Sequence, residues 1–318
     1  MKIGLDVMGG DFAPAATIEG AILALEKIEP ADQIVLFGPQ EVIQKELIDR
    51  KADPKTFSIV HAPDIIGMGE KPIKAYTQKP ESSISKGLKC LKHHEIDSFA
   101  SAGNSGATMV GAMYSVSNIP GVIRPCTLTL VPKETQGMNV MLDIGTNPDV
   151  KPDVLYQFAI LGSIYSQYIL GIKDPKVGLL NVGEEEEKGN LTCQAAFPLM
   201  KDSKDFNFYG NIEGRDLFKD KADVIVCDGF TGNIVLKALE AVYRQMMKRG
   251  LMDEFFDRFN YENYGGSPIL GVNAPVIIGH GISSSRAIMN MILLSKEIHD
   301  IGLTKKIKRA MSNYMESK

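Results

Sequence analysis

The sequence has only four cysteines among its 318 residues, and no two of them form a CxxC pair. Zinc and disulfide-exchange motifs usually need such a pair. Because each cysteine lies in an apolar or helical context, we expect buried free thiols in a reducing compartment. The four are Cys90, Cys126, Cys193 and Cys227.

Long apolar runs and an excess of basic residues are also missing. No run of 18 apolar residues occurs, so no segment is predicted to span a membrane. The first residues, MKIGLDVMGGD, contain no apolar signal segment, so we expect a cytoplasmic protein. Lys and Arg total 35 against 39 Asp and Glu, a net charge of −4. This balance argues against a nucleic-acid-binding protein, which normally has a basic surface.

Several catalytic motifs are absent. The sequence contains no GxGxxG, GxxxxGK[ST], GxSxG or HExxH pattern, which counts against dinucleotide, P-loop, serine-hydrolase and zinc-protease sites. The acidic run Glu184–Glu187 could suggest a metal, but a solvated acidic turn is favoured. We therefore predict no metal and no cofactor. Because no nucleophilic side chain is required, the pattern favours a reaction in which a bound anion attacks.

Short apolar, β-branched runs alternate with helical patterns along the chain. This alternation predicts a three-layer α/β/α sandwich with a mainly parallel sheet. No linker composition appears, so residues 1–318 are treated as a single large α/β unit. The expected strands are residues 2–7, 33–37, 57–61, 98–100, 127–131, 139–142, 176–181, 207–209, 224–227 and 275–278. The expected helices are residues 14–28, 40–50, 82–93, 105–116, 152–170, 191–200, 233–248 and 284–297.

Four glycine-containing loops follow predicted strands. They are Asp6–Asp11, Ser101–Ala107, Asn181–Asn190 and Asp228–Asn233. Glycine and other small residues leave backbone N–H groups accessible to an oxyanion, especially where a helix begins. Ligands of such folds bind at the carboxyl ends of the strands, so the four loops together predict a phosphate or phosphoester site.

Taken together, the loops resemble those of the bacterial acyl-[acyl-carrier-protein]:phosphate acyltransferases, the PlsX family of phospholipid synthesis. The matching segments are DVMGGD at 6–11, SAGNSGA at 101–107, NVGEEEEKGN at 181–190, CDGFTGNIVLK at 227–237 and PILGVNAPVIIGHG at 268–281. They cover essentially the whole chain in the same order. Ser105 is one departure, because the family usually has threonine there; both residues supply a hydroxyl.

The resemblance implies transfer of a long-chain fatty acyl group from acyl carrier protein to inorganic phosphate, which gives acyl phosphate. It also implies a fold of the isocitrate dehydrogenase and phosphotransacetylase type, a homodimer and peripheral membrane association. A membrane glycerol-3-phosphate acyltransferase is a further candidate partner. Three alternatives remain open: a phosphotransacetylase-type transferase using acyl-coenzyme A, an NAD-dependent decarboxylating dehydrogenase on the same fold, and a non-catalytic membrane adaptor.

The implied chemistry needs groups that hold phosphate and stabilise negative charge. Asn104, Lys188, His280 and Asp228 are the candidate catalytic residues. Lys188 and His280 would stabilise negative charge, although His280 could equally be an ordinary loop histidine; Asp6, Asp11 and Asp228 would orient donors. The candidate phosphate-binding residues are Gly9, Gly10, Asp11, Gly103, Ser105, Gly106, Asn181, Gly183, Gly229, Thr231, Gly232 and Asn233.

Residues 234–262 are expected to form a protruding amphipathic helical hairpin inserted within the unit, because apolar residues recur there at spacings of three and four. Core packing, a dimer interface and a membrane-touching tip remain alternatives; we favour a dimer interface whose exposed end touches lipid. An acidic carrier protein also needs a basic docking surface. The candidate clusters are Lys86, Lys89 and Lys92; Arg244, Lys248, Arg249 and Arg258; and Lys305, Lys306, Lys308 and Arg309.

Overall fold

The computed structural model describes residues 1–316, and their contacts divide into two compact units. Unit 1 consists of residues 1–117 and 261–300, and unit 2 begins at Asn118, continues to Asn260 and resumes at Ile301. From the sequence, we expected residues 1–318 to form a single unit. The crossing after Ser117 lies in the segment SVSNIPG at 115–121, and the crossing after Asn260 is followed by GGSP at 265–268. Such Pro, Gly and Ser residues are also typical of ordinary turns, so they did not mark a boundary.

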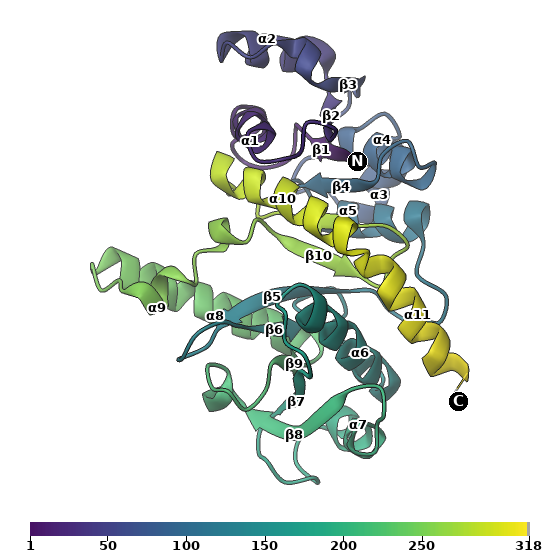
Figure 1. Cartoon of the computed structure of the whole chain (residues 1–318), viewed down its shortest axis with the longest axis vertical. Coiled ribbons are helices and arrows are strands. Elements are labelled where there is room, and N and C mark those ends of the chain that lie inside the picture. Colours follow the sequence, from purple (N-terminus) through teal and green to yellow (C-terminus); the bar gives the residue numbers. More distant parts are fainter. Residues whose placement is uncertain (317–318) are drawn as a thin grey trace. The chain divides into compact units, whose positions relative to one another are not determined.

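Unit 1 contains six strands in the order β3-β2-β1-β4-β11-β10. All of them except β11 are labelled in Figure 1. The neighbours run parallel, except that β10 is antiparallel to β11. The strands are β1 (Lys2–Asp6), β2 (Gln33–Gly38), β3 (Ser58–His61), β4 (Ser98–Ser101), β10 (Ser267–Leu270) and β11 (Val276–Ile278). The helices are α1 (Ala15–Leu25), α2 (Gln40–Asp49), η1 (Pro54–Thr56), α3 (Pro72–Gln78), α4 (Ser83–Lys92), α5 (Ser105–Gly111), the π-helix η2 (Ala112–Val116), η4 (Tyr261–Asn263) and α10 (Ser285–Ile301).

Unit 2 contains five strands in the order β5-β6-β9-β7-β8. They run parallel except for the antiparallel pair β5 and β6. The strands are β5 (Cys126–Pro132), β6 (Met138–Leu142), β7 (Lys176–Asn181), β8 (Asn207–Glu213) and β9 (Val224–Val226). The helices are α6 (Pro152–Tyr168), α7 (Leu191–Lys201), η3 (Gly214–Asp216), α8 (Gly229–Lys248), α9 (Glu254–Asp257) and α11 (Leu303–Glu316).

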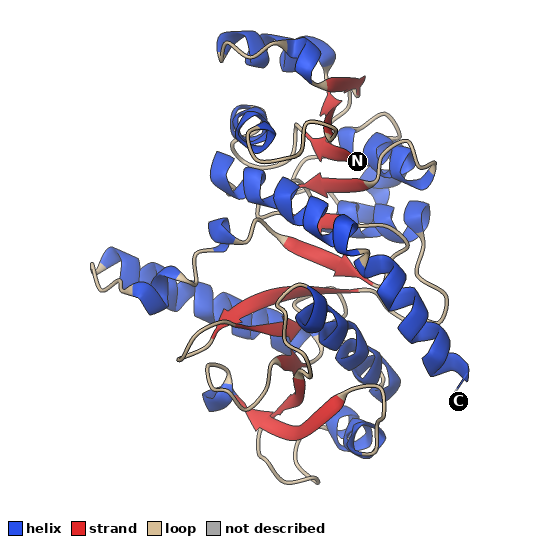
Figure 2. Cartoon of the chain, in the orientation of Figure 1, coloured by secondary structure: helices blue, strands red, loops and turns tan. Residues whose placement is uncertain are grey.

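The inner strands of both units are buried at consecutive positions. β4 and β9 are buried throughout, and β1 and β2 are buried from their second residue onward. A strand buried on alternate positions would face solvent on one side, so continuous burial means that both faces of the strand are covered. Helices and strands alternate within each unit (Figure 2). The predicted mainly parallel α/β class is therefore confirmed.

Among the α-helices and strands of residues 1–316, three were not expected from the sequence: β10, α3 and α11. The sequence of α11 has a recognisable helical pattern, because its buried residues recur at spacings of three and four. These residues are Leu303, Ile307, Met311 and Tyr314. β10 is short and contains Pro268, which weakens any strand signal. α8 begins at Gly229 rather than at the expected residue 233, because Asp228 caps it.

The expected hairpin at residues 234–262 corresponds to most of α8, a single-turn α9 and the start of η4. Phe255 and Phe259 pack edge-to-face on Phe218, with ring centroids 5.9 and 5.8 Å apart, so these aromatic rings lie within unit 2. Among the helices that residues 1–316 form, none combines the length and apolarity that crossing a bilayer requires.

Candidate functional site

Three strand-following loops of unit 1 lie against one another. A Cβ atom on Gly9 would stand 2.6 Å from the amide nitrogen of Gly103, and one on Gly10 would stand 3.1 Å from the carbonyl oxygen of Gly281. Gly10 also has a φ of +104°, which disfavours any other residue. The Asp11 amide donates to the Gly281 carbonyl at 2.7 Å. The glycines thus allow the loops after β1, β4 and β11 to approach at backbone distance.

Asp6 joins two of these loops. Its carboxylate is buried and accepts hydrogen bonds from the Ser101 hydroxyl (2.7 Å) and the Met8 amide (3.0 Å). Ser101 in turn accepts the Gly103 amide at 3.0 Å. Burial raises the pKa of Asp6, although hydrogen bonds from Ser83 and Ser101 oppose the shift. Asp6 therefore orients the loop backbone, as the sequence suggested.

The side chain of Asn104, a candidate catalytic residue from the sequence, is used in hydrogen bonds within the protein. Its Oδ1 accepts the Ala107 amide at 2.9 Å and caps α5. Its Nδ2 donates to the carbonyl oxygens of Gly67, Met68 and Glu70 at 3.0–3.2 Å. All of these bonds occupy the side chain, so Asn104 clamps the 67–70 loop to the start of α5. The sequence contains no local signal for this pairing.

The start of α5 nevertheless offers hydrogen-bond donors. Within residues 1–316, the amides of Asn104, Ser105 and Gly106 have no hydrogen-bond acceptor. Ser105 is exposed, and a Cβ on Gly106 would overlap the ring of Pro72. Adjacent free amides of this kind suit an oxyanion.

His280 lies in the loop after β11, next to Gly281. It is half-buried, and its ring centroid is 4.6 Å from that of Tyr261, whose hydroxyl donates to the Ile282 carbonyl at 3.0 Å. This loop contacts the Gly9–Asp11 segment through Gly281. Unit 1 therefore brings His280 into the same group of loops as the predicted phosphate-binding residues.

In unit 2, Asp228 is the N-cap of α8. Its two oxygens accept the Thr231 amide at 2.8 Å and the Thr231 hydroxyl at 2.9 Å. Gly229 and Gly232 are buried, and Asn233 is exposed. Asp228 therefore orients the first turn of α8, and both of its carboxylate oxygens serve this capping role.

A cavity of about 310 Å³ lies where α6, α7 and α8 of unit 2 begin. The amides of Thr192 and Phe230, two of its lining residues, have no acceptor in the described part of the chain. The other lining residues are Pro148, Asp149, Val150, Leu155, Asn190, Cys193, Asp228 and Thr231. The cavity combines a mixed polar and apolar lining with donors from two helix N-termini.

The Asn181–Asn190 loop is held by its own residues. Asn181 Nδ2 donates to the Lys188 carbonyl at 3.1 Å, and the Lys188 side chain lies over Gly183, whose Cβ position would be 2.8 Å from Lys188 Cγ. Lys188 is exposed. The Lys188 side chain is therefore open to solvent, whereas Asn181 serves the loop itself.

Two loops that the sequence analysis did not select belong to these groups. Residues 67–70 contact Asn104 in unit 1, and Asp143–Asn147 contact Gly229 and Gly232 in unit 2. The second could have been found, because Asp-Ile-Gly-Thr-Asn directly follows the predicted strand 139–142. The first follows no strand end, so no comparable signal marked it.

The cysteines agree with the expectation of free thiols. Cys126, Cys193 and Cys227 are buried, and Cys90 is half-buried. Burial raises the pKa of the Cys126 and Cys227 thiols well above the usual range and also raises that of Cys193. A thiol with a raised pKa is a poor nucleophile at neutral pH.

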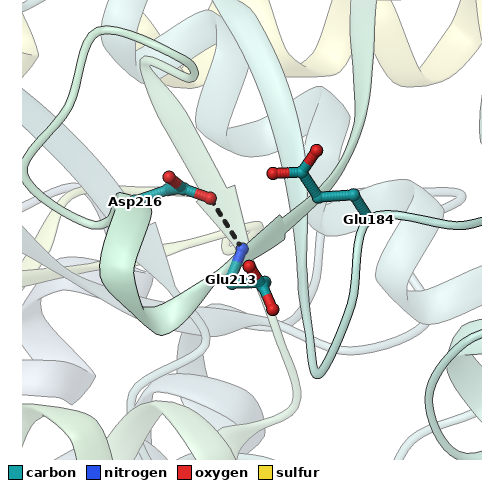
Figure 3. Close-up of side chains that lie close together, drawn as sticks. All are labelled: Glu184, Glu213 and Asp216. Atoms are coloured by element: carbon teal, nitrogen blue, oxygen red, sulfur yellow. Dashed lines mark hydrogen bonds between the residues drawn. The ribbon is translucent and has the colours of Figure 1, made fainter.

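Three carboxylates of unit 2, Glu184, Glu213 and Asp216, lie within 4.8 Å of one another (Figure 3). Lys221 Nζ lies 2.7 Å from Glu184 and 3.1 Å from Asp216, and Lys219 Nζ lies 3.0 Å from Asp216. Arg215 pairs with Glu213, so three cations balance the three carboxylates. We interpret the cluster as an ion-pair network that fastens the loop after β7 to the end of β8.

Comparisons with known proteins place these loops in context. The model of a family described as "Fatty acid synthesis protein" matches residues 1–306. A protein of Dictyoglomus thermophilum named "Phosphate acyltransferase" is 41% identical, with 98% of each chain covered.

Solved structures support the fold. A phosphotransacetylase from Streptococcus pyogenes has a TM-score of 0.66 at 18% identity, with 94% of each chain covered. A 4-hydroxythreonine-4-phosphate dehydrogenase from Klebsiella pneumoniae has a TM-score of 0.53 at 14% identity, covering 93% of this chain and 97% of that one. At such low identity these likenesses show the fold alone.

The Asn104 clamp predicts that Asn104→Ala accelerates amide exchange in residues 67–70 by about 10- to 100-fold. The same variant should lower the free energy of unfolding by about 1–3 kcal/mol, because it removes a helix cap and a buried donor. Hydrogen-exchange mass spectrometry and urea unfolding measure the two effects.

Asn104→Ser separates the cap from the clamp, because serine can still cap α5 but cannot reach three carbonyls. It should retain most of the stability and still release the 67–70 loop; Ser105→Ala serves as the neighbouring control. Unchanged exchange in both Asn104 variants would contradict the clamp.

The ion-pair network predicts a loss of stability in acid. Burial alone would raise the pKa of Asp216, but hydrogen bonds from Lys219, the Glu213 amide and Lys221 lower it to about 2. Because the folded-state pKa lies below the unfolded value of about 3.9, the stabilisation is present above that value and is lost as the pH falls toward 2.

We therefore expect Asp216→Asn to unfold at lower urea concentration than the unmodified protein at pH 7, and the difference to shrink between about pH 4 and pH 2. Asp202→Asn, at an exposed carboxylate of the same unit, is the control. Parallel curves for Asp216→Asn and the unmodified protein across this window would rule out the effect.

Proposed function

This chain belongs to the family of fatty acid synthesis proteins, and we propose that it transfers a long-chain fatty acyl group from acyl carrier protein to inorganic phosphate. Its relatives across nearly the full chain are named phosphate acyltransferases, which supports the reaction class. The product is an acyl phosphate for phospholipid synthesis. The dehydrogenase and phosphotransacetylase structures are similar to this chain in fold only. We therefore choose among these activities on the basis of family membership.

The reaction needs no nucleophile from the protein. Inorganic phosphate is present at neutral pH as a mixture of its monoanion and its dianion, and the dianion is the stronger nucleophile. One of its oxygens attacks the thioester carbonyl carbon, a C–O bond forms, and the C–S bond breaks. A thiol has a pKa of about 8.5, so the carrier leaves as a thiolate that takes a proton from water. The protein positions the reactants and stabilises the oxyanion.

In unit 1, the free amides of Asn104, Ser105 and Gly106 are the donors that we assign to phosphate. Asp6 and the Gly9–Asp11 loop fix the backbone next to them, and Asn104 acts through this clamp rather than as a ligand. These adjacent donors are the observation that best supports a phosphate site in this unit.

In unit 2, we also assign the exposed Asn233 side chain, on the first turn of α8, to anion binding. The Thr231 amide and hydroxyl and the Gly232 amide already donate to Asp228, so these two residues shape the turn instead. Lys188 and His280 stabilise negative charge, since one is an exposed ammonium and the other lies among the phosphate-binding loops of unit 1. Asp228 holds Thr231 in place.

This proposal predicts that the protein forms acyl phosphate faster from palmitoyl-acyl carrier protein than from palmitoyl-coenzyme A. Lys188→Ala and His280→Ala should each lower kcat/KM by about 10- to 100-fold, because each removes a group that stabilises charge. Trapping the acyl phosphate as a hydroxamate in phosphate buffer measures both.

Lys201→Ala is the matched lysine control, because Lys201 is exposed and ion-paired with Glu186. Lys188→Arg should recover part of the activity. Equal turnover of the two donors would favour the coenzyme A alternative, and full activity in both alanine variants would remove Lys188 and His280 from the site.

We also propose that α8 forms a homodimer interface and that its end contacts an anionic membrane. Apolar side chains on this helix are exposed in the chain: Ile234 and Val242 by 53% each, and Met247 by 50%. Leu251, 53% exposed, follows the basic residues Lys248 and Arg249. Apolar and basic groups side by side suit an anionic bilayer surface.

Val242→Asp, in the middle of α8, should convert the dimer to a monomer, because it places a charge in the proposed apolar interface. Leu251→Glu, at the end, should leave the dimer intact and weaken binding to phosphatidylglycerol vesicles. Sedimentation velocity and vesicle flotation measure these effects, with phosphatidylcholine vesicles as the control. A monomeric unmodified protein, or vesicle binding unaffected by Leu251→Glu, would contradict the respective part.

A further inference from the structure

Asp143, the residue that follows β6, is completely buried, and its carboxylate organises the loop that comes after it. Oδ1 accepts the amides of Thr127 (3.1 Å), Ile144 (2.8 Å) and Thr146 (3.4 Å) and the Thr127 hydroxyl (3.3 Å). Oδ2 accepts the Asn147 amide at 2.6 Å and the Asn147 side chain at 3.0 Å. Both oxygens are therefore used, and the loop folds around the carboxylate.

The same loop is fastened to the first turn of α8. The Gly229 amide donates to the Asn147 carbonyl at 2.8 Å. A Cβ on Gly229 would lie 2.7 Å from Asp143 Oδ2, and one on Gly232 would overlap the Asp143 carbonyl oxygen. The two glycines therefore let the turn that carries Thr231 rest directly on Asp143.

One backbone N–H group of this loop does not donate to Asp143. Asp143 accepts hydrogen bonds from the amides of Ile144, Thr146 and Asn147, whereas the Gly145 amide has no acceptor within residues 1–316. Gly145 has a φ of +131°, and its Cβ position lies 3.4 Å from Asn233 Oδ1. Asp143 thus determines where the free Gly145 amide and the exposed Asn233 amide group stand relative to each other.

We propose that Asp143 is a positioning residue of the acyl transfer: it holds Gly145 and the first turn of α8 so that their donors bind phosphate. The inference rests on the proposed function and adds a residue and a loop to the phosphate site. Asp143 is buried and touches no substrate, so it acts through the Gly145 amide and the Asn233 side chain.

Asp143→Asn is the direct test, because it keeps the volume but sets an NH₂ group against N–H donors. We expect the KM for phosphate to rise by about tenfold or more, with smaller changes in kcat and in the KM for the acyl donor. The upward shift in melting temperature that phosphate produces should shrink as well, which measures binding without turnover.

Asp223→Asn is the matched control. Asp223 is also a buried carboxylate of unit 2, but it pairs with Lys133 at 2.6 Å and lies before β9 rather than after β6. It should lower stability and leave the KM for phosphate unchanged. If both variants change the KM for phosphate equally, Asp143 serves general stability and the inference fails.

Thr127→Val decides the question if Asp143→Asn does not fold. It removes only the hydroxyl bonds to Asp143 and Thr146 (2.9 Å), so the KM for phosphate should rise less, and Thr127→Ser should restore it. An unchanged KM in Thr127→Val would overturn the positioning role. Absence of acyl phosphate from the unmodified protein would instead refute the proposed function, and the phosphate-induced melting shift would still test Asp143.

Discussion

A buried aspartate at the carboxyl end of a strand is the interaction on which the candidate site depends in both units. Asp6 after β1 and Asp143 after β6 each fold a glycine-containing loop around a carboxylate. A buried carboxylate without donors would cost several kcal/mol, so the neighbouring amides and hydroxyls must stay in place to satisfy it. This requirement makes loops that would otherwise be mobile into rigid supports for hydrogen-bond donors.

The rigid loops suit a reaction whose nucleophile is a bound anion. Donors held in advance need not reorganise when charge develops on the reacting oxygen, which is the main source of electrostatic catalysis. Cys126, Cys193 and Cys227 are buried, and burial raises the pKa of each thiol, so these three are unsuited to attack at neutral pH. In unit 1, the backbone amides of Asn104, Ser105 and Gly106 are donors of this kind, and none of them is a reactive side chain.

The glycines and the aspartates depend on each other. Gly9 approaches Asp6 and Gly103, and Gly229 approaches Asp143, at distances where a Cβ would collide with the carboxylate oxygen. Each glycine therefore serves close packing as much as access to a ligand. Asn104 extends the same principle to the 67–70 loop, because its side chain satisfies the carbonyls of a segment that has no strand to support it.

The sequence by itself determined the α/β class, the four glycine loops and the family, because strand periodicity, loop glycines and motif order are local properties of the chain. It could not assign Asn104 to the 67–70 loop or reveal Asp143 beneath Gly229, and it did not mark the division into two units. Those features are contacts between distant residues: Asp6 and Ser101, for example, are 95 positions apart. Only the tertiary structure decides which donor meets which carboxylate, because hydrogen-bond geometry is set by the packing of whole strands and helices.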